Sequence, residues 1–183
     1  SGNARVLYYS GTSTTATRVY GQGGSFTTNT ANNGGVSANS LGNPRGIALD
    51  ASGVYVVDET NNRVLYYTGT STTATRVYGQ AGSFSAATAN NGGLSADSLY
   101  QPWGIALDAS GVYVADKVNN RILYYSGTST TATRVYGQGG VFNGNAANNG
   151  GRSADSLSSP YGIWVDNTGL YVADYSNNRV LFY

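Results

Sequence analysis

The chain has 183 residues, a length typical of one domain that is large enough to bury a sizeable core. Only 10 % of these residues are charged and the formal net charge is +1, which leaves no basic stripe to follow a nucleic-acid backbone. The chain has neither cysteine nor histidine, which excludes a disulfide framework, a thiolate nucleophile and the usual general base near neutral pH.

A repeat of 58 residues organises the sequence. The pentapeptide RVLYY and its close variants begin at Arg5, Arg63, Arg121 and Arg179. Three repeats therefore cover residues 5–62, 63–120 and 121–178, and residues 179–183 start a fourth. We treat residues 1–183 as a single domain built from one structural unit.

Each repeat contains four segments that are rich in β-branched and aromatic residues, and loops with Gly, Asn or Ser separate them. In chain order, the first complete set of these predicted strands is 46–50, 54–58, 63–67 and 74–80. No window has a sustained helical period, so the chain is predicted to be all-β. The strands are apolar on both faces, which favours four-stranded antiparallel sheets packed face to face, as in the blades of a β-propeller.

The pattern PxGIAxDxxGxxYVADxxNNRVxxY covers nearly the whole chain and resembles the NHL repeat, most specifically at Pro44, Gly46, Asp50, Asp58 and Arg63. The resemblance implies a β-propeller, commonly six-bladed, of a family that binds proteins, RNA or ligands. Members with lyase activity use metal-binding histidines. This sequence has none, so the resemblance does not imply that activity here.

Counted along the chain, two predicted sets of four strands are complete, two further strands precede them and three follow. About four to eight blades are needed to close a propeller, so one copy cannot make an ordinary ring. We expect a homodimer that closes six blades by strand exchange, in which residues 5–9 of one chain and 179–183 of the other compete for one position. A filament of head-to-tail contacts and a longer array of repeats are the alternatives.

The loops at one end of the predicted strands vary between repeats, while those at the other end hardly change. Before the first strand the repeats read LGNPRG, LYQPWG and LSSPYG, and after the second strand they read DETNN, DKVNN and DYSNN. Varied aromatic and charged side chains on a repeated scaffold indicate a binding rim, with drift in tolerant loops as the alternative. The predicted rim consists of Arg45, Trp103, Tyr161, Tyr100, Glu59, Lys117, Tyr175 and Arg152.

Three aspartates, Asp58, Asp116 and Asp174, each precede an arginine by five residues. Because the pair occurs in every repeat, we expect a structural carboxylate that binds loop amides or the arginine, and no catalytic role. No acidic cluster has the spacing of a metal site, and neither a metal nor a cofactor is expected.

One aromatic residue departs from the repeat within its predicted strand. Trp164 stands where the other repeats have Ala48 and Ala106. A large ring in the first strand, which lies nearest the axis of a propeller, is expected to crowd the central channel or to close a gap. Most of the 16 tyrosines are instead expected to pack between sheets.

These observations favour a non-enzymatic binding or scaffold module that engages a protein or peptide through its rim. One alternative is a glycan-binding propeller, since Trp and Tyr rings stack on sugars. Another is a structural role as a self-assembling surface protein or a designed repeat protein. No run approaches the roughly 20 apolar residues of a membrane span. The low lysine content and the polar, uncharged surface favour an extracellular or cell-surface location over the cytoplasm.

Overall fold

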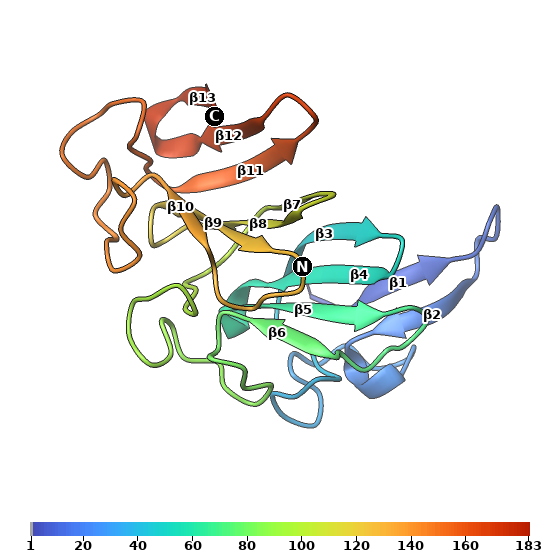
Figure 1. The fold of residues 1–183 in the computed structure, drawn as a ribbon. Coiled ribbons are helices and arrows are strands. Elements are labelled where there is room, and N and C mark those ends of the chain that lie inside the picture. The colour runs from blue at the N-terminus through green and yellow to red at the C-terminus, as the bar shows by residue number, and fades with distance from the viewer. Residues whose placement is uncertain (1) are drawn as a thin grey trace.

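The computed structural model describes residues 2–183, whose strands form four separate antiparallel sheets in chain order (Figure 1). Sheet I consists of β1 (Val6–Tyr9) and β2 (Ala16–Tyr20). Sheet II consists of β3 (Pro44–Asp50), β4 (Gly53–Asp58), β5 (Arg63–Thr68) and β6 (Arg76–Tyr78). Sheet III consists of β7 (Ile105–Asp108), β8 (Gly111–Asp116), β9 (Arg121–Ser126) and β10 (Arg134–Tyr136). Sheet IV consists of β11 (Pro160–Val165), β12 (Leu170–Asp174) and β13 (Arg179–Phe182).

The prediction of an all-β chain with antiparallel sheets is confirmed. The helical segments of the described residues are three short 3-10 helices, η1 (Gln22–Gly24), η2 (Glu59–Asn61) and η3 (Tyr175–Asn177). The two that follow a second strand end at an asparagine in the left-handed region, with φ of 53° at Asn62 and 52° at Asn178. Asparagine tolerates this conformation better than most side chains, so the NN pair of each repeat turns the chain into the third strand.

The fourth strand of each repeat is shorter than the sequence indicates. Residues 74–80 are predicted to be extended, but β6 ends at Tyr78 and only an isolated bridge joins Gln80 to Ser98 beyond it. The reason is Gly79, which adopts a φ of 94° and lies so close to Leu99 that a Cβ there would be 2.6 Å from that side chain. The extended conformation therefore ends at Gly79, where the main chain packs against the Leu99 side chain.

The turn between the first two strands of each repeat is held by an aspartate. Asp108 Oδ1 accepts hydrogen bonds from the backbone N–H and hydroxyl of Ser110, at 2.7 and 2.6 Å, and from the N–H of Gly111 at 2.9 Å. Its other oxygen accepts a bond of 3.0 Å from the Tyr113 hydroxyl. Partial burial raises the pKa of Asp108, but these four bonds outweigh it and hold the pKa below its usual value.

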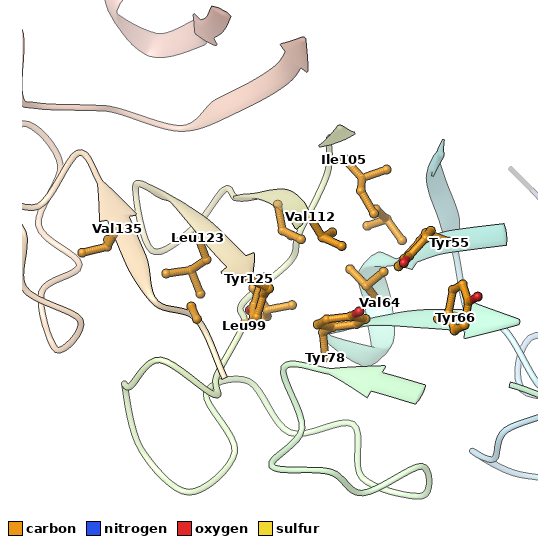
Figure 2. Close-up of a cluster of buried hydrophobic side chains, with 13 residues drawn as sticks. Tyr55, Val64, Tyr66, Tyr78, Leu99, Ile105, Val112, Leu123, Tyr125 and Val135 are labelled. Atoms are coloured by element: carbon orange, nitrogen blue, oxygen red, sulfur yellow. The ribbon is translucent and has the colours of Figure 1, made fainter. Parts of the chain in front are cut away.

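Sheets II and III bury their facing sides against each other. Figure 2 shows Tyr55, Val64 and Tyr66 of sheet II facing Val112 and other apolar side chains of sheet III. Two further clusters join sheet I to sheet II and sheet III to sheet IV. Because sheets II and III are covered on both sides, the first five residues of β5 and of β9 are buried in succession, which explains the unbroken apolar runs.

A tyrosine pair recurs at each boundary between sheets. The rings of Tyr78 and Tyr125 meet edge to face with centroids 5.0 Å apart, and Tyr136 meets Tyr183 in the same way at 5.1 Å. Burial raises the pKa of Tyr183 to about 12, so its ring stays neutral at physiological pH. These contacts confirm that strand tyrosines pack between sheets.

A buried ion pair ties each loop to its sheet. Arg63 Nε donates to Asp58 Oδ2 at 3.0 Å, and both side chains are fully buried. Asp58 also accepts bonds from the N–H groups of Gly42 and Asn43 at 2.8 and 3.1 Å and from Asn61 Nδ2 at 2.7 Å. The predicted structural role of this aspartate is therefore confirmed, since its carboxylate is fully occupied by loop donors and the arginine.

Candidate functional site

Six of the eight predicted rim residues form one continuous row of contacts, which we call the rim ladder. Its members come from the first strands of sheets II to IV, or the residues just before them, and from the loops after the second strands. The order along the ladder is Glu59, Arg45, Trp103, Lys117, Tyr161 and Tyr175.

Arg45 begins the ladder and is held from two sides. Its Nε donates to Glu59 Oε2 at 2.8 Å, and that oxygen also accepts a bond of 2.8 Å from Asn43 Nδ2. The central carbon of its guanidinium lies over the Trp103 ring, 4.2 Å from the ring centroid. Glu59 therefore neutralises Arg45 and orients it over the indole.

The centre of the ladder carries a positive charge between two aromatic rings. Lys117 Nζ lies 4.9 Å from the Trp103 ring centroid and 5.0 Å from that of Tyr161. The two rings are themselves 4.7 Å apart at an interplanar angle of 54°. The ion pairs of residues 2–183 do not include Lys117, so its ammonium contacts ring faces without a carboxylate partner.

The ladder ends in an exposed ring. Tyr161 and Tyr175 have centroids 4.6 Å apart, and Tyr175 is 63 % exposed. In the two preceding repeats, the residues at the position of Tyr175 are Glu59 and Lys117, each of which contacts the rim residue of its own repeat. A tyrosine here leaves the ladder with an aromatic surface at its end.

An open groove of about 450 Å³ runs beside the ladder. Three repeats contribute equivalent residues to its lining, which consists of Pro44, Arg45, Gly46, Ile47, Trp103, Gly104, Ile105, Tyr161, Gly162 and Ile163. A Cβ on Gly46 would lie 2.8 Å from the carbonyl oxygen of Trp103, so only glycine allows the neighbouring strand to approach this closely. The groove thus joins apolar isoleucines to an aromatic and cationic edge.

Two predicted rim residues lie outside the ladder. Tyr100 is partly buried, and its N–H donates to Asp116 Oδ1 at 2.7 Å. Arg152 is exposed in the long loop before β11. Pro44 and the isoleucines Ile47, Ile105 and Ile163 were not among the predicted site residues, because the isoleucines were interpreted only as strand residues and Pro44 only as part of the repeat pattern. Their place at the start of the first strand, next to the variable loop, was the available signal.

The lining of the groove carries few ionisable side chains. Arg45 and Tyr161 are the ionisable residues among those that line it. Across residues 2–183, no group of three or more His, Cys, Asp or Glu side chains is arranged to hold a metal ion. In the same part of the chain, no helix has the length and apolar character needed to cross a membrane.

Comparison with known proteins adds a structural likeness. No protein-family model matches the chain, and no curated protein matches it. Among solved structures, it is similar to the hydrazine synthase of Kuenenia stuttgartiensis, with 12 % sequence identity and a TM-score of 0.46. The match covers 78 % of this chain and 35 % of that one, so the chain spans about a third of the length of that protein.

Proposed function

We propose that this chain is an NHL-type β-propeller segment that binds a protein or peptide, without catalysis, in the groove beside the rim ladder. Three features support the propeller. The sheets are antiparallel with up to four strands, adjacent sheets bury their faces against each other, and the first strands β3, β7 and β11 contact one another in turn.

The main support for the binding proposal is that three residues of the rim ladder also line the groove. At this edge, equivalent positions of the three repeats lie side by side and carry different large side chains, Arg45, Trp103 and Tyr161. Tryptophan, tyrosine and arginine are the residues that most often dominate the energy of protein interfaces.

The geometry also indicates what kind of ligand fits. An extended peptide can place apolar side chains on Ile47 and Ile163 and an acidic side chain near the ammonium of Lys117. An unpaired ammonium at a partly desolvated site gives a carboxylate more binding energy than it has in water. We therefore propose a ligand with alternating apolar and acidic residues.

A glycan fits this edge less well. Sugar stacking needs a free ring face, but cations lie over Trp103 at 4.2 and 4.9 Å and over Tyr161 at 5.0 Å. Tyr175 is the one ladder ring that is largely exposed. A glycan array probed with the same protein is therefore a useful second arm of the test.

A library of displayed peptides tests the proposal. Acidic and apolar sequences should be enriched, and titration should show that Trp103→Ala weakens the selected peptides by at least about tenfold, since one hot-spot residue contributes about 2 kcal/mol or more. Arg152→Ala is the matched control, because Arg152 is exposed and outside the ladder. Equal binding by Trp103→Ala and the unchanged protein would overturn the proposal, as would a library with no enriched peptide.

A further inference from the structure

The outer face of sheet IV exposes side chains whose equivalents are buried elsewhere in the chain. Val180 and Phe182 of β13 are 68 % and 57 % exposed. One repeat earlier, Ile122 and Tyr124 occupy the same positions and are 0 % and 6 % exposed, because sheet IV covers them. Trp164 and Tyr171 extend the exposed face, which we call the donor face, across β11 and β12.

A second uncovered surface lies on β3. Ile47 and Leu49 are 47 % and 65 % exposed, whereas Ile105, the equivalent of Ile47, is 9 % exposed because it packs on sheet II. Sheet I pairs only β1 with β2, the counterparts of β5 and β6, so it offers no strand at this place. We call the surface around Ile47, Leu49 and the nearby Arg5 the acceptor face.

The arginine sites show that the two faces are complementary. The complete site, seen at Arg63, binds Asp58 through Nε, the Phe84 carbonyl through Nη1 at 2.6 Å and the Ser40 carbonyl through Nη2 at 2.9 Å. The Arg63 site therefore has two halves. Asp58 and Ser40, which precede Arg63 in the chain, form one half, and the Phe84 carbonyl of the following loop forms the other.

Each of the outer arginines has one half of this site. Arg179 binds Asp174 and the Ser156 carbonyl, both at 2.7 Å, which are the counterparts of Asp58 and Ser40. Arg5 binds only the carbonyls of Phe26 and Thr28, which belong to the other half. No carboxylate of residues 2–183 pairs with Arg5, and an open pocket of about 350 Å³ lies beside it.

The glycines of the groove give an independent sign of the same complementarity. Gly46 and Gly104 each lie against the main-chain carbonyl of the next repeat, from Trp103 and Tyr161. A Cβ on Gly162 would have the Cβ of Ala173 as its closest neighbour, at 3.8 Å. The position where the next repeat would place its carbonyl is therefore open.

From these complementary surfaces we infer that the occupant of the donor face is the acceptor face of a second copy of this chain, an inference that rests on the propeller part of the proposed function. The main chain at Arg45 of the second copy then lies against Gly162, and Leu49 of that copy packs on Trp164. Asp174 supplies the carboxylate that Arg5 of the second copy lacks. The contact repeats the internal packing of β7 on β3 and of β11 on β7.

Two-fold symmetry makes two such junctions in one closed dimer. At each junction Arg179 and the second copy's Arg5 compete for one aspartate, so one of the strands β13 and β1 gives way. The rim ladder then continues across the junction, since Arg45 of the second copy comes next to Tyr161 and Tyr175.

Light scattering on the 183-residue chain at micromolar concentrations tests the dimer. The expected mass is twice the 19.0 kDa of one chain. Gly162→Ala should give a single-chain mass with an unchanged circular dichroism spectrum, because the added methyl has room within one copy and clashes only at the junction. Asn167→Ala, an exposed change at the opposite turn, should leave the dimer intact.

Charge complementation makes the test specific for these two faces. Trp164→Glu and Leu49→Arg should each abolish the dimer, and an equal mixture of the two variants should restore it. One junction of the mixed dimer then has the two introduced charges facing each other, and the other junction is native. A single-chain mass for the unchanged protein, a mixture that stays monomeric, or a mass that grows with concentration beyond two chains would each overturn the inference.

Peptide binding separates this inference from the proposed function. Selected peptides that bind the monomeric Trp164→Glu variant support the groove whatever the mass of the unchanged protein, because Trp164 does not line the groove. If the unchanged protein is a dimer but binds no peptide of the library, the proposed binding groove is rejected and the inferred dimer stands.

Discussion

The guanidinium carbon of Arg45 lies 4.2 Å from the centroid of the Trp103 ring, although the two residues occupy the same position in consecutive repeats. Tyr161, the third residue of this series, has its ring 4.7 Å from that of Trp103. Since β3, β7 and β11 lie side by side, a repeat position becomes a row of neighbours in space (Figure 1). Residues that differ between the repeats at this position therefore lie next to one another and form one surface.

Replacing the centre of the ladder should lower stability. Trp103→Ala removes two cation–π contacts, at roughly 0.5–1 kcal/mol each, and the ring contact with Tyr161, at roughly 0.5–1.5 kcal/mol, so the free energy of unfolding should fall by about 1.5–3.5 kcal/mol. Urea unfolding at one fixed protein concentration measures it. Arg152→Ala should stay within about 0.5 kcal/mol of the unchanged protein, as exposed substitutions usually do. Equal effects of both substitutions would mean that the ladder contributes nothing to folding.

Breaking a buried ion pair should cost more. Asp116→Asn removes the charge that pairs with Arg121 at 2.8 Å between two fully buried side chains. An uncompensated buried guanidinium lowers the free energy of unfolding by about 3–5 kcal/mol. Asp155→Asn is the control because Asp155 is exposed. Thermal and urea unfolding of both variants check the difference, and a loss below about 1 kcal/mol would contradict the expectation.

Two glycines separate packing from backbone strain. Gly79 and Gly82 have similar positive φ angles of 94° and 81°, but a Cβ on Gly79 would lie 2.6 Å from Leu99 while Gly82 faces open space. Both alanine substitutions carry the strain of a left-handed conformation, and Gly79→Ala alone adds overpacking of about 1–3 kcal/mol. Urea unfolding should therefore rank Gly79→Ala clearly below Gly82→Ala. Similar stabilities would show that Leu99 moves aside at little cost.

The aspartate turns should make stability depend on acid pH. The folded-state pKa of Asp108 lies below its unfolded value, so its stabilisation is fully present above the unfolded pKa of about 3.9 and is lost as the pH falls through the folded pKa. Asp108→Asn should be less stable than the unchanged protein at pH 7, and the gap should narrow below about pH 4. Melting curves from pH 2 to 7 measure this gap. A gap of constant size would show that the bonds do not depend on the charge.

Much of the fold could be predicted from the sequence because it follows from local rules. Apolar runs bounded by turn residues indicated the strands, and an aspartate five residues before an arginine in every repeat indicated the structural pair that Asp58 and Arg63 form. The end of β6 at Tyr78 was predicted wrongly, because Gly79 leaves the extended conformation only where Leu99, 20 residues later, passes beneath it. That contact has no local signature.

The candidate site divides in the same way. Comparing the repeats with one another was enough to identify Arg45, Trp103 and Tyr161 as equivalent and varied. It was not enough to show that Lys117 lies between two rings, or that Arg152 lies apart from the ladder. Those distinctions depend on side-chain direction and on the packing of one sheet against the next.

By itself, then, the sequence determined the repeat, the strands and the positions that vary, since each is encoded in residues close together in the chain. The tertiary structure alone decided which varied residues touch and which faces of the sheets stay uncovered. Both depend on the distance between sheets and the angle at which they pack. Side chains 58 residues apart set that packing jointly, and no single repeat contains it.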